Sequence, residues 1–330
     1  MTVVEQATVS RGELQHTLEQ HRRELTGYCY RMLGSPFEAE DAVQETLLRA
    51  WRSFDKFEGR SAVRSWLYRI ATNVCFDMLG SRSRRATPMD MGPAQEPVAE
   101  NLFTLPEATW IEPIPTGAVA DEGDPAEVAM ERETIRLAFV AALQHLPARQ
   151  RAVLILVEVL RWKAKEVAEL LETSVASVNS ALQRARATLD AGGIATSDPV
   201  PALDDSQRKM LERYVEAFQN YDMEALTALI REDASQSMPP FDMWLSGRAD
   251  ILAWMVGPGI GCKGSKLLPA PNANGAVAFG QYKPSESGSG HDPWALMVLE
   301  LDGDRIGELT FFLATERIFP LFGLPPRLES

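Results

Sequence analysis

The sequence predicts a multidomain protein with two all-α helical domains followed by a C-terminal α+β domain. Three observations support this fold class. Apolar residues recur at three- and four-residue spacing over 12–85 and again over 131–190, as they do on one face of a helix. An acidic, proline-rich stretch separates these two blocks. After residue 206 a helical pattern gives way to short apolar runs broken by Gly, Pro and Asn, which is typical of strands and turns.

The first block, 12–85, is expected to contain helices over 38–52 and 62–79. Small and apolar residues mark one face of each, and Pro36 and Gly80 stand where one helix starts and the other stops. The loop between them reads FDKFEGRS. Stretch 86–130 holds seven prolines and many acids without a helical period, so we expect an extended linker there. Its TWIEPIPTG segment has two interpretations, an anchored loop or a plain tether.

The second block, 131–190, predicts a short helix, a tight turn with Ser174 as N-cap, and a longer helix with a basic end. That pattern is typical of a helix-turn-helix. A second linker, 191–205, leads into the α+β domain, 206–330. We expect its first helix to be interrupted near 220–222, and Asp302 and Gly303 to form a hairpin turn between two strands.

Charge is distributed unevenly along the 330 residues. Taken over the whole chain, the net charge of −13 argues against nucleic-acid binding. However, 60–85 carries six basic and one acidic side chain, and 136–190 carries eight basic and five acidic ones. Between them, 86–135 carries one basic and eleven acidic side chains. Because salt screens charges beyond about 8–10 Å, the two local basic blocks decide whether a polyanion is attracted.

The sequence lacks the residues that several classes of chemistry require. The three cysteines and four histidines are scattered, so neither a disulfide framework nor a metal site is expected. We find no nucleotide-binding glycine loop, no HExxH and no GxSxG, and we therefore expect no catalytic residues and no cofactor. No apolar run reaches the ~20 residues of a membrane span, and no secretion signal opens the chain. These features predict a cytoplasmic protein without a membrane partner.

Two segments carry a family resemblance. The segment EAEDAVQETLLRAWRSFDKFEGRSAVRSWLYRIATNVCFDMLGSRSRR resembles region 2 of sigma-70-type RNA polymerase sigma factors of the extracytoplasmic-function group. LQHLPARQRAVLILVEVLRWKAKEVAELLETSVASVNSALQRARATL resembles region 4 of that family. The resemblance implies an alternative sigma factor that binds core RNA polymerase through its β′ and β subunits and directs it to promoter DNA.

The resemblance also implies site residues. The face that would dock on core polymerase consists of Asp41, Gln44 and Glu45. The residues expected at the −10 element are Phe54, Phe57, Arg60, Ser61, Arg64, Arg69, Asn73, Asp77, Arg82, Arg84 and Arg85. Those expected at the −35 element are Lys163, Lys165, Ser177, Asn179, Ser180, Gln183, Arg184 and Arg186. For any one of them, an ordinary solvated surface position is an equally good interpretation.

The third block resembles SnoaL-like domains of the cystatin-like α+β class. Such folds enclose an apolar pocket, for which the candidate residues are Tyr214, Asp242, Trp244 and His291. We interpret this domain as regulatory rather than enzymatic, and a small-molecule ligand or an anti-sigma factor stays open as a further partner. Two rival functions are a dimeric helix-turn-helix repressor and a SnoaL-class enzyme with accessory helices.

Overall fold

The computed structural model describes residues 11–54, 62–80, 84–119, 132–191 and 203–329. Contacts divide the chain into two compact units that interleave along the sequence. The first, here named the helical unit, comprises Met1–Arg82, Ala118–Ala120 and Leu146–Gly193. The second, the sheet unit, comprises Ser83–Gly117, Asp121–His145 and Ile194–Ser330. This grouping differs from the domain boundaries expected from the sequence, because most of the acidic linker and the start of the second block lie with the sheet.

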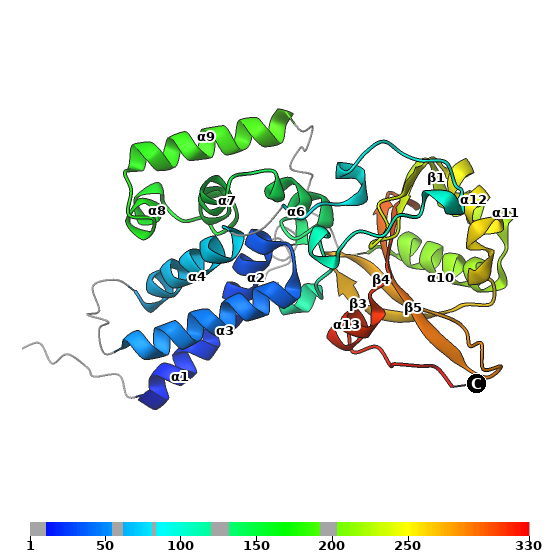
Figure 1. Ribbon diagram of the computed structural model, residues 1–330, viewed down its shortest axis with the longest axis horizontal. Coiled ribbons are helices and arrows are strands. Elements are labelled where there is room, and N and C mark those ends of the chain that lie inside the picture. The colour runs from blue at the N-terminus through cyan, green and yellow to red at the C-terminus, as the bar shows by residue number, and fades with distance from the viewer. Residues whose placement is uncertain (1–10, 55–61, 81–83, 120–131, 192–202, 330) are drawn as a thin grey trace, which may run out of the picture. The chain divides into compact units, whose positions relative to one another are not determined.

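The helical unit contains both predicted N-terminal helices and the helix-turn-helix (Figure 1). Its elements are α1 (Arg11–Gln20), α2 (Arg22–Leu33), α3 (Pro36–Ser53), α4 (Val63–Leu79), α7 (Ala148–Leu154), the π-helical turn η6 (Ile155–Val159), α8 (Ala164–Leu170) and α9 (Val175–Ala191). The helices expected over 38–52 and 62–79 are confirmed as α3 and α4. The turn between α2 and α3 uses Gly34 at φ +74° and then Ser35, whose side chain caps α3 by accepting from the Glu38 amide.

Aromatic side chains join the helices of this unit. The Tyr28 hydroxyl on α2 lies 2.8 Å from Thr72 Oγ1 on α4, and the rings of Tyr28 and Tyr68 meet edge to face. Tyr68 in turn contacts the ring of Trp162, which directly precedes the helix-turn-helix, at a centroid distance of 5.1 Å. Arg151 on α7 donates to the backbone carbonyl of Met32. The helix-turn-helix therefore packs on α2 and α4, and all belong to one compact unit.

The sheet unit is built on one six-stranded sheet in the order β2-β1-β6-β5-β4-β3. The strands are β1 (Ile230–Ser237), β2 (Trp244–Ser246), β3 (Lys266–Ala273), β4 (Ala276–Pro284), β5 (His291–Asp302) and β6 (Arg305–Phe312). β1 and β6 are parallel and the other pairs are antiparallel. The predicted hairpin is confirmed, because Asp302 pairs with Arg305 across its turn.

One face of the sheet is covered by α10 (Asp205–Asn220), α11 (Met223–Leu229) and α12 (Arg248–Val256), with η7 (Pro258–Cys262) following. The break expected near 220–222 is confirmed. Tyr221 ends α10 in the left-handed conformation, and the Asp222 side chain caps α11 by accepting from the Ala225 amide at 3.0 Å. Leu309 and Phe311 of β6 point into this core, so the residues that alternate with them face the opposite side.

The opposite face is covered by the linker and by α6 (Leu137–Gln144), with α13 (Thr315–Leu321) packed on β5. The linker contains short 3-10 helices at Pro88–Asp90, Ala99–Asn101, Glu107–Thr109 and Thr116–Ala118. Trp110, Ile111 and Ile114 are buried. Asn274 pairs with Ile114 in both directions, side chain to amide and amide to carbonyl. Of the two interpretations of TWIEPIPTG, the anchored loop is therefore confirmed.

Candidate functional site

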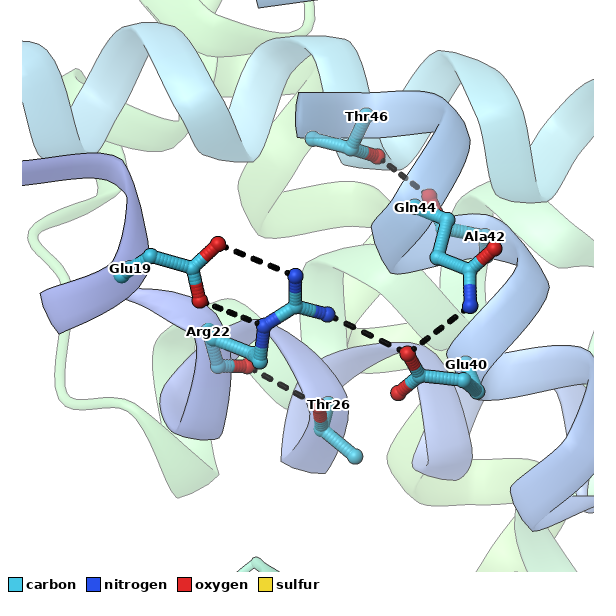
Figure 2. A network of polar contacts seen from close by, with 7 residues as sticks. All are labelled: Glu19, Arg22, Thr26, Glu40, Ala42, Gln44 and Thr46. Atoms are coloured by element: carbon cyan, nitrogen blue, oxygen red, sulfur yellow. Dashed lines mark hydrogen bonds and ion pairs between the residues drawn. The ribbon is translucent and has the colours of Figure 1, made fainter. Parts of the chain in front are cut away.

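The exposed side of α3 carries an ordered polar network. Asp41 and Gln44 are exposed and Glu45 is half-buried. Gln44 Nε2 donates to Glu40 Oε1 at 3.0 Å, Arg22 of α2 pairs with Glu40 at 3.2 Å, and Arg22 also pairs with Glu19 of α1 at 2.8 Å (Figure 2). The hydrogen bond from Arg22 lowers the pKa of Glu19. Three helices thus fix the acidic surface on which Asp41, Gln44 and Glu45 lie.

Arg49 links this surface to α4. Its Nε donates to Glu45 at 2.6 Å and its Nη1 pairs with Asp77 at 3.2 Å. The hydrogen bond to Glu45 raises the pKa of the Arg49 guanidinium. Asp77, which is expected at the −10 element, is therefore tied to a residue of the expected polymerase-docking face. Asn73, one turn before it, is exposed.

Arg64 and Arg69 of α4 face the helix-turn-helix. Arg64 Nε pairs with Glu24 of α2 at 2.7 Å, and its guanidinium lies 5.2 Å from the ring centroids of both Tyr68 and Trp162. Arg69 donates to the backbone carbonyl of Glu169 on α8 at 3.3 Å. In this arrangement Arg64 and Arg69, which are expected to contact DNA, form their contacts within the helical unit.

The remaining −10 candidates lie elsewhere. Phe54 closes α3 and is half-buried. Arg84 and Arg85 belong to the sheet unit, where Arg84 Nη1 lies 2.7 Å from His145 Nδ1. Arg85 is buried, pairs with Glu112 at 3.5 Å and donates to the Trp110 carbonyl, so it anchors the linker. Four candidates lie outside the described residues: Phe57, Arg60, Ser61 and Arg82.

The second helix of the helix-turn-helix, α9, has a buried apolar face and an exposed polar face, although Val175 at its start is exposed. Ser174 caps it by accepting from the Ser177 amide at 3.1 Å, as the sequence predicts. Val178, Leu182 and Ala185 are buried. The residues expected to point outward are all exposed: Ser177, Asn179, Ser180, Gln183, Arg184 and Arg186.

Partners within the unit position some of these −35 candidates. Arg184 donates to Ser180 Oγ at 2.7 Å, and Arg186 Nε donates to Glu158 at 3.1 Å. Lys163 and Lys165, at the start of α8, are exposed as well.

The four pocket candidates of the sheet unit do not assemble a site. Tyr214 is fully buried and donates to Met297 Sδ at 3.4 Å, and burial raises its pKa well above the usual range. Asp242 and Trp244 hold the linker, since the Asp242 amide donates to the Phe103 carbonyl and Trp244 Nε1 to the Gly92 carbonyl. His291 lies at the start of β5, with Nε2 3.2 Å from the Gly264 carbonyl.

A cavity is present within the helix-covered face, but it is small. It has a volume of about 30 Å³ and is lined by residues such as Phe218, Gln236 and Trp254, and none of the four candidates lines it. That volume holds one or two waters rather than an organic substrate. In the described part of the chain, no group of three or more His, Cys, Asp or Glu side chains could hold a metal ion.

Sequence reasoning missed three residues that contact Arg64 and Arg69 of α4. They are Trp162, Glu24 and Glu169. They decide where the cations of α4 point, yet Glu24 and Glu169 each lie far from their arginines along the chain. Of the three, Trp162 carries a signal, because it is the one tryptophan in the second block, 131–190.

Comparison with known proteins identifies three segments of the chain. Family models match as Sigma-70 region 2 over residues 17–85, Sigma-70 region 4 over 136–189 and the Nuclear transport factor 2 (NTF2) domain over 206–257. The ECF RNA polymerase sigma factor SigG of Mycobacterium tuberculosis (strain H37Rv) is 43% identical over 328 residues, which cover 98% of this chain and 87% of that one. The chain belongs to the extracytoplasmic-function (ECF) family of sigma-70 factors.

Other relatives agree with this assignment. The RNA polymerase sigma-H factor of Pseudomonas aeruginosa is 30% identical over 170 residues, 52% of this chain and 80% of that one. The crystal structure of the Mycobacterium tuberculosis ECF sigma factor SigJ matches with a TM-score of 0.61 at 20% identity, covering 94% of this chain and all of that one, and so shares its fold. The ECF sigma factor described here is thus an alternative sigma factor that binds core RNA polymerase and promoter DNA to direct transcription initiation.

The match to region 4 and the contacts of the structure disagree about one helix of this ECF sigma factor. The region 4 model starts at residue 136 and so includes α6. By its contacts α6 belongs to the sheet unit, whereas α7, α8 and α9 belong to the helical unit. The described residues contain no helix long and apolar enough to cross a membrane.

Proposed function

We propose that the exposed face of α9 reads the −35 element and that Asp41, Gln44 and Glu45 of α3 dock on the β′ subunit of core polymerase. The observation that supports the first part is the burial pattern of α9, in which Ser177, Asn179, Ser180, Gln183, Arg184 and Arg186 are exposed whereas Val178, Leu182, Ala185 and Leu189 are buried. Side chains such as Asn, Gln and Arg at the start of a recognition helix contact base edges and phosphates.

The test is transcription in vitro with purified core polymerase and a promoter selected by the full chain. Replacing Arg184 or Asn179 by Ala is expected to lower initiation roughly fivefold to 100-fold, because one good base contact contributes about 1–3 kcal/mol. Arg208→Ala, an exposed arginine of the sheet unit, is the matched control. Equal initiation by Arg184→Ala, Asn179→Ala and this control would contradict the assignment of α9.

We further propose that α4 contacts the −10 element only after it separates from the helix-turn-helix. The support is that Arg64 and Arg69 are engaged with Glu24, Trp162 and Glu169 inside the helical unit. Polymerase binding would then have two effects, because it brings the factor to DNA and it frees these two cations. The protein acts in the cytoplasm, where bacterial polymerase transcribes.

The sheet unit is proposed to be regulatory rather than enzymatic. Two observations support this: the helix-covered cavity is too small for a substrate, and Tyr214, Asp242, Trp244 and His291 have separate structural partners. The unit also holds the linker that joins the two promoter-reading modules. The test is a chain that ends at residue 200, whose promoter-dependent transcription should differ from that of the full chain.

A further inference from the structure

A second, larger cavity lies on the opposite face of the sheet and entirely within the sheet unit. Its volume is about 180 Å³. Ile111 of the linker, Leu137 and Ala141 of α6 and Phe312 of β6 form apolar walls. An engineered apolar cavity of about 150 Å³ is known to hold benzene, so this space fits a molecule with a single six-membered ring.

Polar groups line one side of this cavity. Glu308 and Thr310 of β6 and Ser237 of β1 all face it, and Ser237 and Thr310 are themselves buried. Thr310 Oγ1 donates to Glu308 Oε1 at 3.3 Å. Within the described residues this is the one hydrogen bond of the Glu308 carboxylate, whose other oxygen is available to a ligand.

The charges around Glu308 are unbalanced. Glu308 lies beside Glu300 in the register of β5 and β6. Arg136 pairs with Glu300 and, at 3.5 Å, with Glu133. On the side of the linker and α6, Asp90 and His145 pair with each other at 2.8 Å. Among the described residues Arg136 therefore pairs with two carboxylates, and its charge also acts on Glu308.

This imbalance affects protonation at the cavity wall. Burial, with the charge of Glu300 in second place, raises the pKa of Glu308 to about 7, against the smaller opposing effects of the Thr310 hydrogen bond and Arg136. An added positive charge beside Glu308 would offset both effects by favouring its ionised form. The cavity has room for a ring next to this carboxyl group.

We propose that this cavity binds a small organic cation, a primary amine on a single aromatic ring, with its ammonium on Glu308 and its ring between Ile111, Leu137 and Phe312. The apolar walls favour the ring and the carboxylate selects the ammonium. Thr310 holds Glu308 in place. The binding site is separate from the polymerase and DNA surfaces, and its existence does not depend on how α3, α4 or α9 function.

The test is a calorimetric titration of the full chain with benzylamine, which stays protonated between pH 6 and pH 8. Toluene, which has the same ring without the charge, is the ligand control. We expect benzylamine to bind with a Kd on the order of 1 mM or tighter at pH 8. Affinity should be about tenfold weaker at pH 6, because the ionised fraction of a carboxyl group with a pKa near 7 falls from about nine-tenths to one-tenth.

Two variants test separately the charge of Glu308 and the volume of the cavity. Glu308→Gln should weaken benzylamine binding at pH 8 at least tenfold and abolish its pH dependence, whereas Glu316→Gln on α13 should change neither. Ala141→Leu fills the cavity and should abolish binding with Glu308 intact. Thermal unfolding of each variant establishes that it is folded. Equal affinity for toluene and benzylamine, unchanged binding by Glu308→Gln, or no binding by the folded full chain at millimolar benzylamine would each overturn the proposal.

Discussion

Arg84 and Arg85 are adjacent in sequence and have opposite environments. Arg84 is exposed and contacts His145, whereas Arg85 is buried against Glu112 and the Trp110 carbonyl. Both belong to the arginine cluster that resembles a DNA-binding segment. The two arginines differ because Arg85 pairs with Glu112, a carboxylate far along the chain. A cluster of adjacent arginines in the sequence does not indicate which of them will find such a partner.

Replacing Arg85 with Ala is expected to lower the free energy of unfolding of the sheet unit by about 3 kcal/mol. The substitution removes the ion pair of Arg85 with the buried Glu112 carboxylate, which also lies 3.5 Å from Arg317. Arg84→Ala is the matched control and should cost less than about 1 kcal/mol, because exposed pairs contribute little. Urea unfolding followed by circular dichroism measures both. If the two variants are equally stable, Arg85 does not anchor the linker.

Glu308 should make the stability of the sheet unit depend on pH. Its pKa is raised to about 7 in the folded state, so between the ordinary value of 4.5 and about 7 the folded state binds more protons than the unfolded one. The contribution of Glu308 to the free energy of unfolding therefore decreases as the pH rises from 4.5 to about 7. Relative to Glu308→Gln, the wild type should lose up to about 3 kcal/mol between pH 5 and pH 8. Parallel stability curves for the two proteins over this range would contradict this prediction.

At the scale of elements, the sequence predicted those features that depend on local periodicity. The bounds of α3 and α4, the cap at Ser174, the break after α10 and the hairpin at Asp302 all follow from short-range patterns, and all are confirmed. The outward residues of α9 were predictable for the same reason. The partners of Arg64 and Arg69 were not, because they come from α2, α8 and the turn before α8.

The ordered structure of the linker could not be predicted from short-range sequence patterns. It has no helical period, and its prolines and acids are typical of an extended tether. Its few large apolar residues, Trp110, Ile111 and Ile114, nevertheless bury themselves on the sheet, and Asn274 supplies backbone pairing. Burying three such side chains contributes several kcal/mol toward holding the segment on the sheet, and the backbone pairing with Asn274 adds to this.

Trp162→Ala is expected to loosen α4 from the helix-turn-helix. The ring is buried and contacts both Tyr68 and Arg64, so its loss removes the contact that joins α4 to the start of α8. Amide hydrogen exchange in α4 and α8 should accelerate about 100-fold or more, given the usual cost of truncating a buried tryptophan. Trp51→Ala, at a 39% exposed tryptophan on α3, should have a much smaller effect. Unchanged protection of α4 in Trp162→Ala would show that Trp162 does not hold the modules together.

At the scale of the whole molecule, the two compact units share the chain rather than dividing it in sequence. The sheet unit includes Ser83–Gly117 and the segment that contains α6, both of which precede the helix-turn-helix. Removing residues after 200 therefore takes away the strands on which the linker and α6 rest. Such a truncation does more than delete an appended domain, because it exposes apolar residues of the part that remains.

A chain ending at residue 200 should keep its helical unit and lose the order of its linker. We expect limited proteolysis within 84–119 to be at least tenfold faster than in the full chain, because Trp110, Ile111 and Ile114 lose their sheet. Promoter-dependent transcription should change in the same experiment, while binding to core polymerase persists. Equal transcription by both forms would contradict a regulatory sheet unit, and equal protease resistance would contradict the anchored linker.

The assignment of α6 to the sheet unit matters to anyone who wishes to exchange promoter preferences between proteins of this family. A chimera joined at residue 136, where the region 4 match begins, would place the α6 of another protein on the sheet of this one. Leu137, Ala138 and Ala141 would then meet mismatched neighbours. A junction at Leu146 leaves that surface native and transplants only α7, α8 and α9 of the region 4 match.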